Sequence, residues 1–160
     1  MIRLVYGEDR RVGEWMVTKG AASIWRDGAK CIGLEQNGKL TAGVLYDNYN
    51  YASICAHIAV DGGLTREYLF HIFAYPFLQL QCNVIIGLVG SKNIKSRQFV
   101  EHLGFVLSTA IDRGHPDGSL LVYIINKEDC RYISRGADSL QTPPIVMEKL
   151  HVQAGTATCP

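Results

Sequence analysis

The segment from residue 82 to residue 89 is a nearly continuous apolar run rich in β-branched residues. Such a run is typical of a β-strand that is buried on both faces. A helical pattern precedes it from Arg66 to about Leu80, with Thr65 as a favourable N-cap, and another follows from Asn93 to Gly104. A buried strand between two helices predicts a sheet that carries helices, with a parallel, right-handed strand–helix–strand unit at its centre.

The segments on either side of this centre predict further strands. Residues 30–36 and 39–46 are joined by Asn37-Gly38, a dipeptide typical of a two-residue hairpin. A long β-rich run covers residues 51–60, and Pro76 should kink or end the helix that follows. The remaining expected elements are strands at 2–6, 105–112 and 119–125, a helix at 8–19 and a second short helix at 21–25. This order predicts an α/β fold with one mixed sheet of about seven strands and helices on both faces.

The chain has 160 residues, the size of one domain, and its 48% hydrophobic and 19% charged residues indicate a globular protein. Periodicity is lost after Gly136, so we expect a domain at residues 1–135 and a C-terminal arm at 136–160. Apolar residues late in this arm motivate the hypothesis that it contacts a second copy in a homodimer. They are Ile145, Val146, Met147 and Leu150.

Charge and cysteine content exclude several classes of function. The net charge is +1, without the basic excess of a nucleic-acid-binding protein. The five cysteines are scattered and lack metal-ligand spacing, so we expect no metal site and reduced thiols in the cytoplasm. No apolar run reaches the roughly 20 residues that span a bilayer, and the N-terminal residues do not resemble a signal peptide. We therefore expect neither a membrane nor a nucleic acid as partner.

The junction from Val60 to Arg66 is the first candidate ligand site, because a strand ends, two glycines follow and a helix begins. The N–H groups and dipole of a helix N-terminus favour a phosphate there. The alternative is a plain strand-to-helix loop capped by Thr65, and local sequence favours this alternative. No Gly-x-Gly-x-x-Gly fingerprint is present.

The segment from Val89 to Phe105 resembles the strand–helix signature of the GNAT superfamily of N-acetyltransferases. That signature has an Asn after a buried strand, a small residue one turn later, an apolar helix face and then Gly-Phe. The matching residues are Asn93, Ser96, Leu103, Gly104 and Phe105. The preceding hairpin, the long central strand and Tyr75-Pro76-Phe77 occur in the expected order, so the resemblance covers most of residues 1–125.

The resemblance implies that acetyl-CoA is the cofactor and that its pantetheine arm enters a gap between two splayed central strands. It implies a backbone edge for this arm, a loop for the pyrophosphate, and Asn93 and Arg97 as further contacts. The edge would comprise Ile58, Ala59 and Val60, and the loop would comprise Gly62, Gly63, Thr65 and Arg66.

Two departures from the family pattern stand out. The usual phosphate loop has Gln or Arg and then Gly-x-Gly or Gly-x-Ala, for which Gly62-Gly63 and Arg66 stand in here. Many members also carry a tyrosine that reprotonates the CoA thiolate, and Val100 occupies its place. Some branches, such as ribosomal-protein acetyltransferases, lack it too and use Ser or water. The chain is most similar to short members of that kind, including phage and prophage ones, by His57 and Cys130-Arg131.

His57 is the candidate general base, because an imidazole can take a proton from an ammonium near neutral pH. The alternative is a core histidine satisfied by a backbone carbonyl. Asn93 would assist at the site, and Tyr49 and Tyr51 would shape the acceptor pocket or merely pack at a strand end. The predicted reaction is direct transfer of acetyl to an amine of a small molecule or a protein. The rival interpretation is a GNAT-like module without catalysis.

Overall fold

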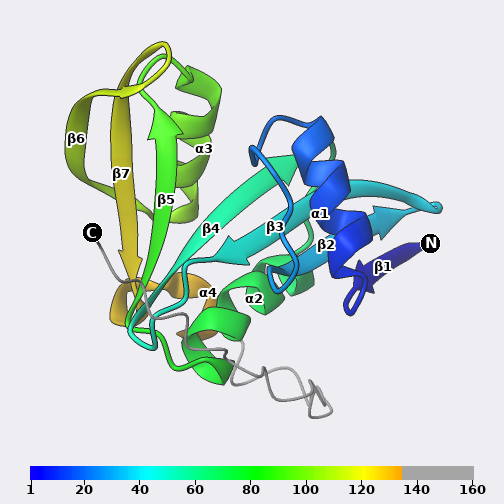
Figure 1. Cartoon of the computed structure of the whole chain (residues 1–160). Coiled ribbons are helices and arrows are strands. Elements are labelled where there is room, and N and C mark those ends of the chain that lie inside the picture. Colours follow the sequence, from blue (N-terminus) through cyan, green and yellow to red (C-terminus); the bar gives the residue numbers. More distant parts are fainter. Residues whose placement is uncertain (135–160) are drawn as a thin grey trace.

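The computed structural model describes residues 1–134 and contains one seven-stranded mixed sheet with helices on both faces (Figure 1). The strands are β1 (Ile2–Val5), β2 (Lys30–Gln36), β3 (Lys39–Asp47), β4 (Ser53–Val60), β5 (Val84–Gly90), β6 (Val106–His115) and β7 (Gly118–Asn126). The helices are α1 (Asp9–Thr18), α2 (Arg66–Ala74), α3 (Ile94–Leu103) and α4 (Arg131–Ser134), with a π-helical turn η1 (Tyr75–Gln79) and a 3-10 turn η2 (Lys127–Asp129). The predicted fold class is confirmed.

The strands lie in the order β1-β2-β3-β4-β5-β7-β6, and only the central pair β4–β5 is parallel. The hairpin between β2 and β3 turns at Asn37 and Gly38, whose φ angles of 52° and 80° are the left-handed values that a type I′ turn requires. The predicted parallel centre and its antiparallel flanks are therefore confirmed.

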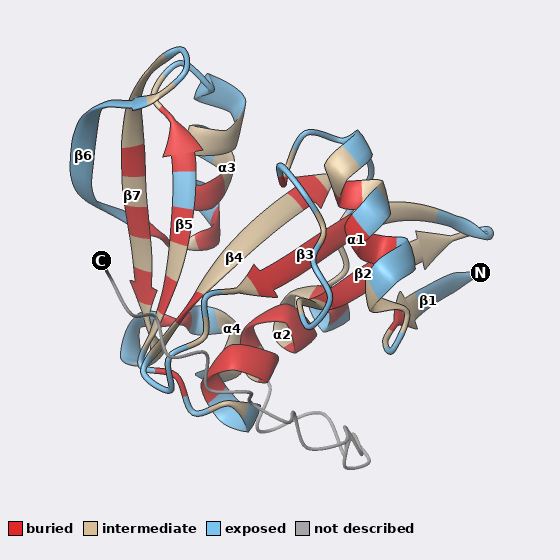
Figure 2. Cartoon of the chain, in the orientation of Figure 1, coloured by how far each residue is buried: buried red, intermediate tan, exposed pale blue. Residues whose placement is uncertain are grey.

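Two apolar cores lie on opposite faces of the sheet (Figure 2). The larger core packs α2, α3 and the residues around Cys130 against one face, with fully buried Tyr68 and Tyr123. The smaller core packs Val12 and Met16 of α1 against the other face of β2, β3 and β4. The second face is covered only at the α1 end within residues 1–134, and this leaves room beside β4 and β5.

The largest difference from the predicted elements lies at residues 21–25, which form bends and irregular backbone instead of a helix. Trp25 explains this, because its ring packs against α1 where Gly13 leaves space. A Cβ atom at Gly13 would lie only 1.8 Å from the Trp25 ring. Tertiary packing of one tryptophan thus overrides the local helical propensity.

The second predicted helix ends as expected at its proline. Thr65 caps α2, its hydroxyl accepting from the Tyr68 amide at 3.1 Å, and the regular helix stops at Ala74. Pro76 then lies in η1, where the Leu80 amide donates to the Tyr75 carbonyl at 3.0 Å. The predicted arm at 136–160 lies outside the described residues.

Candidate active site

The central strands β4 and β5 separate after three residue pairs. Ser53, Ile54 and Cys55 pair with Val84, Ile85 and Ile86, and no pair follows, although both strands continue. Beyond the last pair, a cavity of about 510 Å³ opens between the diverging strands. β4 contributes Ala56, His57, Ile58, Ala59 and Val60 to its wall, and β5 contributes Gly87, Leu88, Val89 and Gly90. We call this cavity the slot.

The slot passes between the strands from one face of the sheet to the other. On the α3 side its wall includes Asn93, Ser96, Phe99, Val100 and Phe105. On the opposite side it is bounded by residues 19–23, which follow α1. β4 stays paired with β3 and β5 with β7 along this stretch, but the edges that face each other are unpaired. The backbone N–H and C=O groups on these two edges are therefore available to an extended ligand that carries amides.

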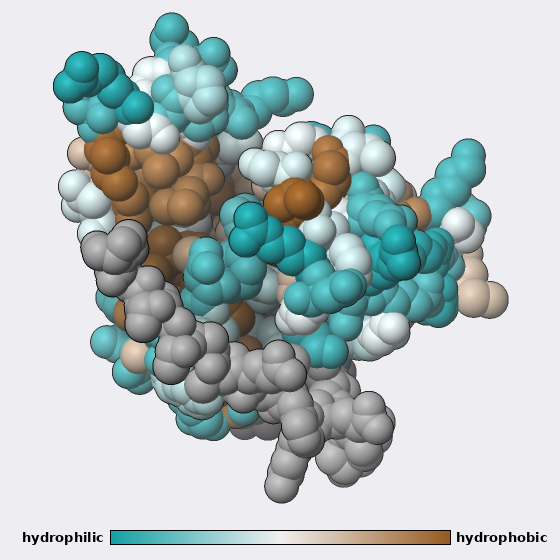
Figure 3. All heavy atoms as spheres, in the orientation of Figure 1, coloured by the Kyte–Doolittle hydropathy of each residue, from teal (hydrophilic) through white to brown (hydrophobic). Residues whose placement is uncertain are grey.

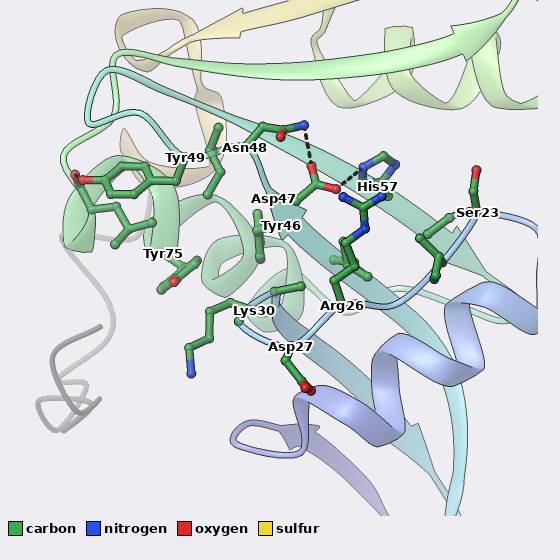
Figure 4. Close-up of a pocket in the computed structure, with 17 residues that line it drawn as sticks. Ser23, Arg26, Asp27, Lys30, Tyr46, Asp47, Asn48, Tyr49, His57 and Tyr75 are labelled. Atoms are coloured by element: carbon green, nitrogen blue, oxygen red, sulfur yellow. Dashed lines mark hydrogen bonds and ion pairs between the residues drawn. The ribbon is translucent and has the colours of Figure 1, made fainter. Parts of the chain in front are cut away.

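A second cavity of about 700 Å³ lies on the α1 side of the sheet, between the end of β3 and the loop that follows α1 (Figure 4). We call it the acceptor cavity. Its charged and histidine residues are Arg26, Asp27, Lys30, Asp47 and His57. Its apolar and aromatic wall includes Ile54, Tyr46, Tyr49, Tyr75 and Leu80. Burial raises the pKa of Tyr46 and of Tyr75, so these phenols stay neutral and act as wall rather than as acids.

His57 lines both cavities, together with Ala22 and Ser23, and it is the titratable residue of these three. Its side chain is 24% exposed, and its Nε2 lies 3.1 Å from Oδ2 of Asp47. A carboxylate can only accept, so a neutral imidazole in this contact carries its proton on Nε2. The other nitrogen, Nδ1, then keeps its lone pair on the side of the ring away from Asp47 (Figure 4).

The antiparallel register of β3 and β4 creates this pair. His57 lies opposite Leu45, and Asp47 is two residues further along β3 on the same face. Diagonal neighbours of this kind are within reach of long side chains. Sequence reasoning missed Asp47. The signal that could have found it is the Asn37-Gly38 turn, since counting pairs outward from that hairpin and across the next turn gives the face of each residue.

No family model matches this sequence, and no curated protein matches it at a significant level. Solved structures do match in shape. The spermidine/spermine N-acetyltransferase SpeG from Vibrio cholerae, in mutant forms, superposes with a TM-score of 0.66 at 16% identity, covering 84% of this chain and 99% of that one. The structure of yncA from Salmonella typhimurium, named a putative acetyltransferase and solved with its cofactor acetyl-CoA, gives a TM-score of 0.61 at 13% identity, covering 79% of this chain and 94% of that one. The chain has the GNAT fold.

Four of the residues predicted to contact the cofactor line the slot, and their contact with a cofactor stays a prediction. Ile58, Ala59 and Val60 all line the slot, on the stretch of β4 that has no partner on β5. Asn93 lines it too and caps α3, its Oδ1 accepting from the Ser96 amide at 3.1 Å. Asn93 thus places the N-terminus of α3 in the slot wall, and its role in catalysis stays a prediction.

The predicted pyrophosphate loop follows the slot without lining it. Gly62, Gly63 and Arg66 are exposed, and Gly63 accepts a hydrogen bond from Gln36 at 3.2 Å. The Thr65 hydroxyl caps α2 by accepting the hydrogen bond of the Tyr68 amide. Arg97 also lies outside the slot wall and donates to the Ser91 carbonyl at 3.1 Å. The contribution of these residues to phosphate binding therefore stays a prediction.

The two tyrosines predicted at the acceptor side differ in position. Tyr49 lines the acceptor cavity, and its hydroxyl donates to the Leu80 carbonyl at 3.3 Å. Tyr51 is 66% exposed, lies outside the cavity wall and packs against the Tyr49 ring at 5.0 Å between centroids. Val100 is buried and lines the slot, so the slot presents a methyl surface where many GNAT members have a phenol.

Two further absences concern only the described part of the chain. Residues 1–134 hold no cluster of three or more His, Cys, Asp or Glu side chains that could bind a metal ion. None of their helices combines the length and the apolar content needed to cross a membrane.

Proposed function

We propose that the protein is an N-acetyltransferase that moves the acetyl group of acetyl-CoA to a primary amine within a ternary complex. One observation carries the proposal: His57 lies where the slot of the splayed sheet meets the acceptor cavity. A base at the junction of two cavities can act on an amine in one while an acyl group is delivered from the other. The structural similarity to acetyltransferases of low sequence identity shows the fold alone. The geometry of the site is what supports the activity.

The slot fits an acetyl-CoA arm. An extended chain with two amides can pair with the free edge of β4 at Ile58 to Val60, and the first turn of α3 presents N–H groups toward the same space. Acetyl-CoA supplies the activated acetyl group. Gly62, Gly63, Thr65, Arg66 and Arg97 remain the proposed contacts for its phosphates, reached beyond the mouth of the slot.

His57 then activates the acceptor. Its Nδ1 takes a proton from the amine, directly or through a water, and Asp47 holds the ring and stabilises the imidazolium. The amine nitrogen attacks the thioester carbon, and backbone N–H groups near Ile58 to Val60 stabilise the oxyanion. The C–S bond breaks, and the CoA thiolate takes a proton from water or from Ser96, which lines the slot. This activity implies a cytoplasmic location, where acetyl-CoA is available.

Acetyl-CoA should raise the thermal stability of the protein. At a concentration about 100 times its Kd, a ligand adds about 2.7 kcal/mol to the free energy of unfolding, which for a domain of this size is roughly 5–10 °C in Tm. Differential scanning fluorimetry checks this, with ATP as a control that shares the adenine nucleotide but lacks the pantetheine arm. Equal shifts with both compounds, or none with acetyl-CoA, would contradict the proposed cofactor.

The rival function is a non-catalytic module that binds CoA weakly or not at all and acts through protein contacts. Val100 in the slot wall favours it, because no side-chain acid stands where many relatives of this fold have one. The two functions differ in binding as well as in turnover. A protein whose Tm does not respond to acetyl-CoA and that releases no CoA thiol with any amine, measured with a thiol reagent, supports the rival.

We also propose that the chain forms a homodimer through the β6 edge of the sheet. Apolar residues gather there on the face away from α3, as Figure 3 shows over β5, β7 and β6. Leu88, Val106 and Ile111 are 43–58% exposed on this face, and β6 is an edge strand that can pair with itself in a second copy. A spermidine N-acetyltransferase from Vibrio cholerae with this fold is dodecameric, which supports assembly.

Light scattering should give the mass of a dimer for the full chain and of a monomer for Ile111→Lys. Ile2→Lys is the matched control, since Ile2 is 59% exposed on the opposite edge strand, β1. A chain ending at Gly136 tests whether the C-terminal arm contributes. A monomeric full chain, or equal effects of both lysine variants, overturns the proposed surface.

A further inference from the structure

We propose that the acceptor carries a carboxylate next to its amine, as an amino acid does, and that Arg26 binds this carboxylate. The inference rests on the proposed function and goes beyond it, because it names the substrate class and a residue that selects it. Arg26 lies in the wall of the acceptor cavity, and its guanidinium extends toward His57 and Asp47 (Figure 4).

The neighbours of Arg26 explain its direction. Trp25 packs on α1 over Gly13, and the Arg10 guanidinium lies 5.8 Å from the centre of its ring. Asp27 points away from His57 toward α1 and acts on the charge of Arg10, whose pKa is raised first by Glu14 and also by Asp27. Trp25 and Asp27, the residues before and after Arg26, are thus both directed toward α1. Arg26 lies between them, where a turn begins in which the Ala29 amide donates to the Arg26 carbonyl at 3.1 Å, and its side chain points into the cavity (Figure 4).

The charged residues around the cavity leave the Arg26 guanidinium available to bind a substrate carboxylate. Lys30 is paired with Asp9 at 3.1 Å, and Asp47 contacts His57. Within residues 1–134, no carboxylate lies within ion-pair distance of Arg26. A guanidinium presents N–H donors in a planar fork that matches a carboxylate in a bidentate contact. Arg26 and His57 face the same part of the cavity. A small molecule whose carboxylate and amine lie close together, as in an amino acid, can therefore contact both residues at once.

The same charges disfavour a polyamine acceptor. A polycation requires several unpaired carboxylates near the reacting amine, whereas Asp27 points away from His57 at the α1 end of the cavity and Asp47 is held by His57. Arg26 would repel the second ammonium group. The remaining wall is apolar and aromatic, with Ile54, Tyr49 and Leu80. It suits an uncharged side chain on the amino acid, such as a benzyl group.

The test compares phenylalanine with phenylalaninamide, which share the amine and the ring and differ in the carboxylate. We expect the wild-type protein to acetylate the acid with a kcat/KM roughly 10- to 100-fold above that of the amide, the range of one hydrogen bond to a charged group. Arg26→Ala should lose most of this preference by lowering kcat/KM for the acid alone. Arg26→Lys should keep part of it. Lys39→Ala, which removes the same charge at the exposed β2–β3 turn, is the control and should change neither value.

Binding gives a readout that does not depend on turnover. N-acetylphenylalanine should raise the Tm of the CoA-bound wild-type protein, and neither its carboxamide nor the Arg26→Ala variant should show this shift. Equal rates or equal shifts for acid and amide, or a faster reaction with spermidine, overturn the role of Arg26. Failure of the proposed function is distinct from this, because it removes the stabilisation by acetyl-CoA or the acetylation of every amine, phenylalaninamide included.

Discussion

Replacement of His57 by alanine lowers kcat by roughly 10²- to 10⁴-fold, the usual contribution of a positioned general base. The change removes the group that lines both cavities and leaves the edge of β4 at Ile58 to Val60 in place. The shift of Tm by acetyl-CoA should therefore stay close to the wild-type value. Steady-state release of CoA and scanning fluorimetry on the same preparation measure the two effects.

Controls separate catalysis from packing at this position. His102→Ala removes an exposed histidine of α3 and should leave kcat unchanged. Asp47→Asn keeps the shape but replaces the acceptor of the Nε2 proton by an amide, so it should lower kcat by less than His57→Ala does. Added imidazole should restore part of the rate in His57→Ala. A fully active His57→Ala protein would remove this residue from the mechanism.

Replacement of Ala56 by phenylalanine abolishes the stabilisation by acetyl-CoA. Ala56 is the first residue of β4 beyond the last pair with β5, and it lines the slot where the strands begin to diverge. A benzyl side chain occupies the space that the thioester requires. Scanning fluorimetry with and without acetyl-CoA measures the loss, and turnover should disappear with it.

The control for this variant addresses its cost in stability. Overpacking a half-buried position costs about 1–3 kcal/mol, so the Tm without ligand falls. Ala74→Phe enlarges a half-buried alanine at the end of α2, outside the slot wall. It should lower the Tm as well and still respond to acetyl-CoA. A wild-type response in Ala56→Phe would mean that the cofactor arm does not enter the slot.

The elements that local sequence predicts well are those with local causes. Asn37-Gly38 favours a hairpin because both residues readily adopt the positive φ that the central positions of a type I′ turn require. Gly104 likewise ends α3 with a φ of 102°. The helix predicted at residues 21–25 is absent for the opposite reason, since their conformation depends on a contact of Trp25 with Gly13, twelve positions earlier in the sequence.

The site residues also divide into those that local sequence predicts and those that depend on tertiary structure. His57 could be chosen because one strand carries it next to the predicted gap. Asp47, Arg26 and the exact extent of the gap depend on strand register and on the path of the loop after α1, which a single sequence does not contain. Gly62 and Gly63 are assigned to the pyrophosphate only through the family resemblance. In the structure they follow the slot as exposed backbone, and their role stays a prediction.

The separation of β4 from β5 leaves two unpaired strand edges at the centre of the sheet. Three residue pairs join the two halves of the backbone ladder there, and the helices behind them carry the rest of the connection. If the CoA arm fills this gap, the metabolite acts as an interior structural part of the fold. The empty form is then the one most open to proteases, and the lifetime of the protein in a cell follows the supply of acetyl-CoA.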